Sequence, residues 1–313
     1  MVAMLGYQAG LSSQSGLDAR QSAVLFYIRL PRVVLGVLVG AVLGISGAAI
    51  QGIFRNPLAE PGLIGISSGA TFFAVLMIVM EISVFRMAAG PLGFYALAVS
   101  AFTGACLTTF LVYHLSVRQG KTDTGTLLLS GIAINALAGA FTGLLTYMAT
   151  DEQLRTITFW SLGSLDGASW KTVAGLLPFA VLPLVILPFQ AKPLNAMALG
   201  DAQALHMGID VRRLKRRVII WSTLAVGSAV AVCGMIGFIG LIVPHMIRMV
   251  FTADHRLVIP GSALLGAALL TLADLAARTV VAPAELPIGI LTALTGTPVF
   301  LYIIIRERKK NKL

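Results

Sequence analysis

Residues 191–217 read AKPLNAMALGDAQALHMGIDVRRLKRR and form the one sizeable polar segment of a chain that is otherwise apolar. This polar segment contains six cations and two acids: Lys192, Arg212, Arg213, Lys215, Arg216, Arg217, Asp201 and Asp210. Because apolar sequence flanks it on both sides, the polar segment is a candidate contact site between a membrane protein and a soluble partner.

The composition of the whole chain is that of a membrane protein. Hydrophobic residues make up 57% of the 313 residues, charged residues only 12%, and the mean hydropathy is +0.90. A typical soluble domain contains about 25% charged residues. The sequence therefore predicts an all-α, polytopic transmembrane helix bundle that forms a single domain over residues 1–313.

Nine apolar runs fit the length of a transmembrane helix, which needs roughly 20 residues to cross a hydrocarbon core of about 30 Å. The predicted spans are residues 33–52, 63–80, 92–112, 126–148, 173–189, 218–233, 235–250, 260–276 and 287–305.

Residues 218–251 are ambiguous, because a single helix of that length would be about 51 Å long. Two spans broken near Gly234 and Gly237 place 16 of the 23 Lys and Arg residues on the side that holds the polar segment and the C-terminus. A single span would divide these cations almost evenly. The positive-inside rule therefore favours two spans, with the polar segment and the C-terminus in the cytoplasm.

The net charge of +10 then lies on the cytoplasmic face, so it reflects membrane topology and disfavours nucleic-acid binding. An odd number of spans places the N-terminus outside, with residues 1–32 as a periplasmic lead-in. Residues 1–20 lack the pattern of a signal peptide. We therefore expect a further transmembrane helix upstream of Met1.

Ionisable side chains at mid-membrane depth would indicate a proton or sodium relay, and the predicted spans contain almost none. Asp274 and Arg278 are one helical turn apart near the outer end of their span and can pair with each other. This pattern disfavours an ion-coupled secondary transporter, which remains an alternative.

Enzyme motifs occur only in the wrong context. Residues 65–69 read GISSG and match a nucleophile elbow around Ser67, but that elbow requires a preceding strand. Residues 120–122 resemble the end of a phosphate-binding loop whose earlier glycine is absent. We therefore predict no ATPase of the chain's own, and an intramembrane enzyme built on Ser67 remains the second alternative.

The sequence indicates no metal site and no cofactor bound by this chain. The four histidines lack metal-ligand spacing with one another or with the two cysteines, and all are predicted to lie at or near the cytoplasmic surface: His114, His206, His245 and His255.

The first span carries Gly36, Gly40, Gly44 and Gly47, which predicts close helix packing. We favour packing within one subunit over a dimer contact.

Within the polar segment, Asp201 is predicted to cap a short helix over residues 202–207, which Gly208 ends. Asp210 is predicted to cap a second short helix that begins at Val211. Two short helices of this kind would form a rigid lever on the cytoplasmic face. An ordinary basic loop that holds the topology is the alternative.

Five strings of the chain, in this order, resemble the permease subunits of type II ABC importers for ferric siderophores, haem and cobalamin (FecCD/BtuC-like). They are RLPR (29–32), RNPLAEPGLIGISSGA (55–70), LGDAQALHMG (199–208), GFIGLIVPHMIR (237–248) and ELPIG (285–289). The resemblance runs from Arg29 to the C-terminus. SSGA and FWSLGSL (159–165) resemble haem permeases in particular.

The resemblance implies a homodimer of ten-helix permeases in the bacterial inner membrane, so the first helix of the family is not among the nine spans. It also implies two cytoplasmic ATPase subunits that use ATP and Mg, a periplasmic binding protein, and an iron chelate as cargo. Haem is the expected cargo, with ferric siderophore or cobalamin as alternatives.

The resemblance also implies roles for individual residues. The segment that docks on the ATPase would include Leu199, Gly200, Asp201, Ala204, His206 and Gly208. The binding protein would dock on Arg29, Arg32 and Arg278, for which interfacial anchoring, or pairing of Arg278 with Asp274, is the alternative. The translocation pathway would include Ser67, Ser68, Ser130, Asn135 and Thr142, each of which could equally bond a neighbouring helix.

Overall fold

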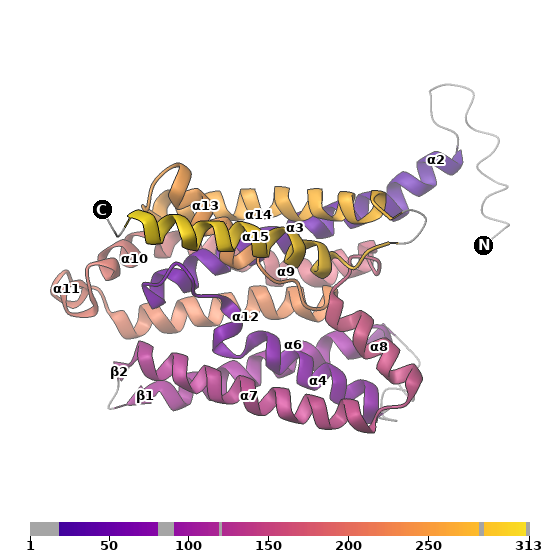
Figure 1. Cartoon of the computed structure of the whole chain (residues 1–313), viewed down its shortest axis with the longest axis horizontal. Helices are drawn as coiled ribbons and strands as arrows, with labels where there is room; N and C mark the ends of the chain where they lie inside the picture. Colours follow the sequence, from indigo (N-terminus) through magenta and orange to yellow (C-terminus); the bar gives the residue numbers. More distant parts are fainter. Residues whose placement is uncertain (1–18, 81–90, 119–120, 282–284, 311–313) are drawn as a thin grey trace.

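The computed structural model describes residues 19–80, 91–118, 121–281 and 285–310, and these residues form a bundle of helices (Figure 1). The helices are α2 (Ala19–Val24), α3 (Leu30–Phe54), α4 (Ile66–Met80), α6 (Pro91–Ser116), α7 (Thr124–Met148), α8 (Asp151–Leu162), α9 (Trp170–Ile186), α10 (Ala191–Ala198), α11 (Asp201–His206), α12 (Val211–Cys233), α13 (Ile239–Val250), α14 (His255–Thr279) and α15 (Ile288–Lys310).

Short irregular elements connect these helices. The π-helix η1 (Leu25–Arg29) joins α2 to α3, and the 3-10 helices η2 (Pro61–Ile64) and η3 (Leu187–Gln190) precede α4 and α10. A hairpin of two-residue strands, β1 (Val117–Arg118) and β2 (Lys121–Thr122), joins α6 to α7. The predicted all-α bundle is thus confirmed apart from this hairpin. Helical structure also extends back to Ala19, into the expected lead-in, whose residues 1–18 lie outside the described part.

Six helices in the described part of the chain are long and apolar enough to cross a membrane: Gln21–Phe54, Tyr95–Ser116, Thr124–Met148, Trp170–Ala198, Val211–Cys233 and His255–Thr279. Three further apolar helices are shorter: Ile66–Met80, Ile239–Val250 and Ile288–Tyr302. The 12 residues of α13 extend only about 18 Å at 1.5 Å per residue, so the count of nine full spans remains a prediction.

The ambiguous run after residue 218 contains two helices, as predicted. Helix α12 ends at Cys233, and Gly234 follows with a positive φ of 70° that a glycine tolerates at little cost. Residues 234–238 form the break, and the carbonyl of Cys233 accepts a hydrogen bond of 2.8 Å from the Ser164 N–H. The break therefore lies beside the loop that follows α8.

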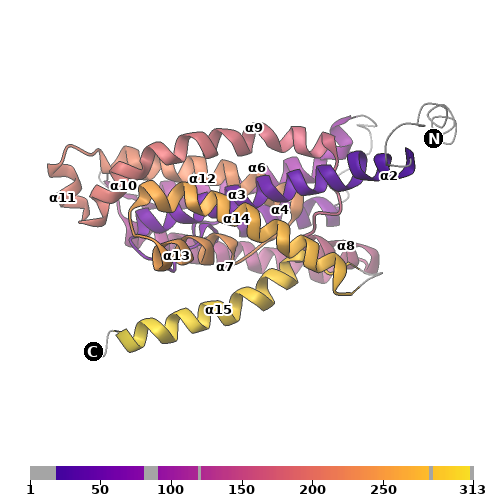
Figure 2. The same cartoon turned by 90° about the horizontal axis from the view of Figure 1, so that it is seen from above.

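The two ends of the bundle carry different elements (Figures 1 and 2). Helices α10 and α11, the β hairpin and the C-terminal end of α15 lie at one end, whereas α2 and α8 lie at the other. The polar segment and the C-terminal end of α15 therefore share one end, in agreement with the charge distribution. We call this the coupling end and the opposite one the outer end; that the coupling end faces the cytoplasm remains a prediction.

Helix α3 runs through the middle of the bundle, where α9, α12, α13 and α14 pack around it. A methyl group at Gly40 would overlap the carbonyl oxygen of Gly266 on α14, and one at Gly44 would overlap that of Ser262. A methyl group at Gly47 would likewise overlap the carbonyl oxygen of Gly240. These glycines thus bring helix backbones together inside one subunit, which confirms the prediction that the glycines of the first span serve packing within one subunit.

We predict that Gly44→Ala lowers the melting temperature of the purified protein in detergent, because overpacking costs about 1–3 kcal/mol. The matched control is Gly143→Ala on α7, where nothing lies within 4 Å of the added carbon. Since alanine favours a helix over glycine by about 1 kcal/mol, the control is expected to melt at or above the wild-type temperature. Equal melting temperatures for the two variants would contradict this account of the α3–α14 contact.

Candidate functional site

The polar segment begins with two short helices, α10 and α11, at the coupling end. Helix α11 starts at Asp201, and its N-cap is Gly200, whose φ of 124° suits only glycine. The prediction that Asp201 caps this helix is therefore wrong, because Asp201 is already the first residue of α11 and its carboxylate pairs with Lys215 and Arg55. Gly208, with a φ of 80°, does follow the end of α11 as predicted.

The predicted cap at Asp210 is confirmed, since its carboxylate accepts a hydrogen bond of 2.9 Å from the Arg213 N–H. The helix that it caps is not a short one. It is α12, which continues without a break from the basic residues of the polar segment into the apolar sequence that ends at Cys233. The two short helices are thus α10 and α11, and the basic residues belong to a transmembrane helix.

The Asp201 side chain is 38% exposed, and its carboxylate meets two cations. Its Oδ2 lies 2.7 Å from the Nζ of Lys215, and its Oδ1 lies 3.4 Å from an Arg55 guanidinium nitrogen. Lys215 is only 1% exposed and also donates to the Thr122 carbonyl at 3.1 Å and to Thr124 Oγ1 at 2.8 Å. The sequence did not distinguish Lys215 from the exposed cations beside it.

The residues expected to contact an ATPase differ in exposure. Leu199, His206 and Gly208 are exposed, whereas Gly200 and Ala204 are buried. Ala204 packs inside the chain and Gly200 forms the turn before α11, so the assignment of both residues to the ATPase contact remains a prediction. Two exposed apolar residues were missed: Leu205 and Met207 are 55% and 61% exposed. The sequence feature that could have identified them is a pair of apolar residues at the end of a short helix within a polar segment.

Helix α10 is tied to the start of α14 through Asn195. The Asn195 amide donates to Asp254 at 2.5 Å, and its oxygen accepts a bond of 2.9 Å from the His255 N–H. His255 is 7% exposed and His245 is 6% exposed. These two histidines are thus packed between helices of the bundle, and the prediction that all four lie at or near the cytoplasmic surface of the membrane stays a prediction.

A cluster of opposite charges lies at the outer end. The Arg32 guanidinium contacts Asp274 at 2.9 Å, Glu285 at 2.9 Å and Asp166 at 3.0 Å. Arg278 pairs with Asp274 at 3.2 Å, which confirms the predicted pairing. Partial burial favours a higher pKa for Asp166, but its hydrogen bonds with Glu285 and Ser164 and the charge of Arg32 outweigh burial, so the pKa is lowered overall.

The three arginines expected to dock a binding protein therefore differ. Arg32 and Arg278 are engaged with Asp274 inside the chain, whereas Arg29 is exposed on the π-helix η1. Within the described part of the chain, Arg29 has no ion pair or side-chain hydrogen bond. Sequence reasoning missed the convergence of Asp166 and Glu285 on Arg32, because these residues are far apart along the chain.

Two of the expected pathway residues are joined to each other. Ser68 on α4 donates a hydrogen bond to the Asn135 oxygen on α7, and the Asn135 amide donates to the Gly62 carbonyl at 3.1 Å. Thr142 bonds the Ala138 carbonyl of its own helix at 2.7 Å. The contacts of Ser68 and Asn135 match the alternative role of bonding a neighbouring helix, and they link α4, α7 and η2, whereas the Thr142 contact lies within α7.

The remaining two pathway residues, Ser67 and Ser130, are half-buried. Ser67 is the second residue of α4, and the element before that helix is the 3-10 helix η2. The structural context of a nucleophile elbow, a strand followed by a helix, is therefore missing at Ser67. This argues against the intramembrane enzyme.

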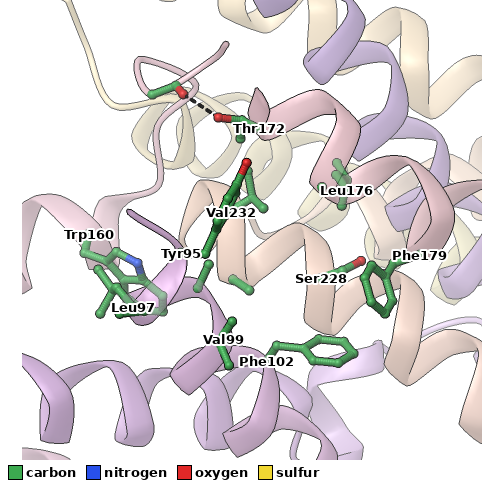
Figure 3. A pocket seen from close by; sticks show the side chains of 15 residues that line it. Tyr95, Leu97, Val99, Phe102, Trp160, Thr172, Leu176, Phe179, Ser228 and Val232 are labelled. Atoms are coloured by element: carbon green, nitrogen blue, oxygen red, sulfur yellow. Dashed lines mark hydrogen bonds between the residues drawn. The ribbon is translucent and has the colours of Figure 1, made fainter. Parts of the chain in front are cut away.

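A cavity of about 680 Å³ lies between α6, α9 and α12 (Figure 3). Its lining is mostly apolar and includes Leu97, Phe102, Leu176, Phe179 and Val232. None of the expected pathway residues lines it. This cavity is therefore separate from the predicted pathway on α4 and α7.

Comparisons with known proteins agree with this geometry. The FecCD transport family matches residues 3–306. The hemin transport system permease protein of Yersinia pestis is 50% identical over 91% of this chain and 84% of its own length. The cobalamin import system permease protein of Halobacterium salinarum is 41% identical over 99% of this chain and 80% of its own length.

Among solved structures, an inward-facing ABC transporter of metal-chelate type has a TM-score of 0.84 and 34% identity. The match covers 97% of this chain and 96% of that one. The arrangement of the helices is thus shared along nearly the whole length of both chains.

We predict that Asp274→Ala lowers the free energy of unfolding in detergent by about 3 kcal/mol, because it removes the main partner of two partly buried arginines. The control is Glu152→Ala, which removes an exposed acid from α8 at the same end and should change stability by less than about 0.5 kcal/mol. Equal losses from a denaturant titration of the two variants would show that the cluster does not stabilise the fold.

Proposed function

Because the chain belongs to the FecCD transport family, the membrane-spanning permeases of type II ABC importers, we propose that it imports an iron chelate, haem in particular. The observation that supports haem is the higher identity to the hemin permease than to the cobalamin permease. Ferric siderophore and cobalamin are the alternatives for the same machinery. The family supplies the membrane subunit, and ATP is hydrolysed by partner subunits.

The coupling end is the proposed contact with two ATPase subunits. Leu199, Leu205 and Met207 present apolar side chains at this end, where the neighbouring surface is basic. Apolar residues rimmed by polar ones are characteristic of protein interfaces. The turn at Gly200 and the buried Ala204 would hold the contact helix α11 in a defined position.

A second copy of the chain is the proposed partner in the membrane. Helix α7 is the least buried of the long apolar helices, and large side chains such as Leu129, Leu137 and Leu144 are exposed along it. Two such faces from two copies would enclose a pathway with weakly polar walls. Ser130, Asn135 and Thr142 lie on this helix, and Ser67 and Ser68 lie on the adjacent α4.

Docking of a periplasmic binding protein is proposed at the outer end. Of the three arginines, Arg29 makes no ion pair within the described part of the chain and can meet an acid of the partner, whereas Arg32 and Arg278 would first have to leave Asp274. Charge pairs at the rim of an interface accelerate and orient encounter more than they tighten binding. Arg29 would thus act mainly on the association rate.

We predict ATP-dependent uptake of haem when the chain is reconstituted in proteoliposomes with its ATPase and binding protein. Haem, a ferric siderophore and cobalamin should be compared in the same vesicles, with haem transported fastest. An ion-coupled transporter would instead import its substrate without ATP and stop when the ion gradient collapses. Preferred uptake of another chelate would overturn haem as the cargo while leaving the importer assignment intact.

We predict that Arg29→Glu slows association of the binding protein with the reconstituted permease severalfold at low salt, and that added salt reduces the difference. Surface plasmon resonance on nanodiscs measures this rate. The control is Arg155→Glu, which reverses an exposed cation on α8 at the same end. An unchanged association rate for Arg29→Glu would exclude Arg29 from the docking site.

A further inference from the structure

Lys215 is the buried cation of a basic run whose other members are exposed. Arg212, Arg213, Arg216 and Arg217 face outward, whereas the Lys215 side chain is 1% exposed. Burying an ammonium group is costly unless every N–H finds a partner. Lys215 meets this condition, because its three N–H groups match three acceptors at 2.7, 2.8 and 3.1 Å.

These three acceptors belong to different elements. Asp201 is the first residue of α11, Thr122 belongs to strand β2, and Thr124 begins α7. The Lys215 ammonium, on the first turns of α12, therefore fastens the short helix at the coupling end to the start of α7. Asp123, between Thr122 and Thr124, caps α7 by accepting a hydrogen bond of 2.7 Å from the Thr126 N–H. Lys215 is therefore attached to the capped N-terminus of α7.

Asp201 also links α11 to the end of α3. Its Oδ1 is buried beside Arg55, the residue that ends α3 with a left-handed φ of 51°. Arg55 opens the segment that leads through η2 to Ser67 and Ser68 on α4. The same carboxylate thus contacts one cation next to α7 and another next to the segment before α4.

We propose that the Asp201–Lys215 pair is a relay that transmits movement of α11 to α7 and to residues 55–65, and that Asp201 is a positioning residue and not a contact of the ATPase. The relay rests on the proposed function, in which ATPase subunits move α11. The pair is suited to this role because the ammonium group of Lys215 is buried and its three N–H groups already have acceptors. Helix α11 therefore cannot shift without either moving Lys215 with it or breaking the contact between Asp201 and this buried ammonium group.

The test uses the assembled complex in nanodiscs. Each copy of the chain carries a spin label on Tyr147→Cys, at the outer end of α7. The two native cysteines, Cys106 and Cys233, are replaced by alanine so that no other site of this chain is labelled. Tyr147 is 88% exposed. In this otherwise wild-type background, adding ATP with vanadate should shift the label-to-label distance. Lys215→Met and the isosteric Asp201→Asn should retain bound ATPase subunits and ATP hydrolysis, lose the shift, and reduce haem uptake per ATP about tenfold.

Two controls separate the relay from other causes. Arg216→Met removes an exposed cation from the same helical turn and should leave the shift intact. Leu205→Asp should release the ATPase subunits, because it places a charge in the proposed contact.

Three results would overturn the relay: a shift that persists in both Lys215→Met and Asp201→Asn, loss of ATPase binding in Asp201→Asn, or loss of the folded complex in both variants. Absence of a shift in the Tyr147→Cys background itself would overturn the proposed function, and the relay with it.

Discussion

The contact between the backbones of α3 and α14 is the constraint on which the other helices depend. In a membrane, lipid tails are as apolar as the side chains, so helices associate through close packing and hydrogen bonds and not through removal of apolar surface from water. Gly40, Gly44 and Gly266 let the two backbones touch. Helix α3 can then occupy the middle of the bundle, with α9, α12 and α13 against its other faces.

Paired charges fasten the bundle at its two ends. At the outer end, Asp274 on α14 joins this helix to α3 through Arg32 and also pairs with Arg278 on its own helix. At the coupling end, Lys215 joins α11, α12 and the start of α7. Each joint contains one buried charge, Asp274 or Lys215, and breaking its ion pairs would leave that charge without compensation.

Much of this architecture followed from local sequence signals. The glycine spacing in the first span predicted the close packing, the glycines after residue 233 predicted the break between α12 and α13, and Asp210 predicted the start of α12. Each signal acts within one or two helical turns, so neighbours along the chain suffice to identify it. The prediction for Asp201 was wrong for the complementary reason, since two distant cations, Lys215 and Arg55, attract the carboxylate that would otherwise cap α11.

The sequence by itself determined the class of the protein, the positions of its long apolar helices and its family resemblance, because hydropathy, glycine spacing and contiguous motifs are properties of the chain. Only the tertiary structure decided which charges are available to partners. Arg29 and Arg32 are three residues apart on one helical segment, yet Arg29 is exposed and Arg32 is held by Asp166, Asp274 and Glu285. Lys215 and Arg216 are adjacent, yet one is buried in a joint and the other is solvated. Burial depends on which distant helix packs against a side chain, and that information exists only once the bundle has formed.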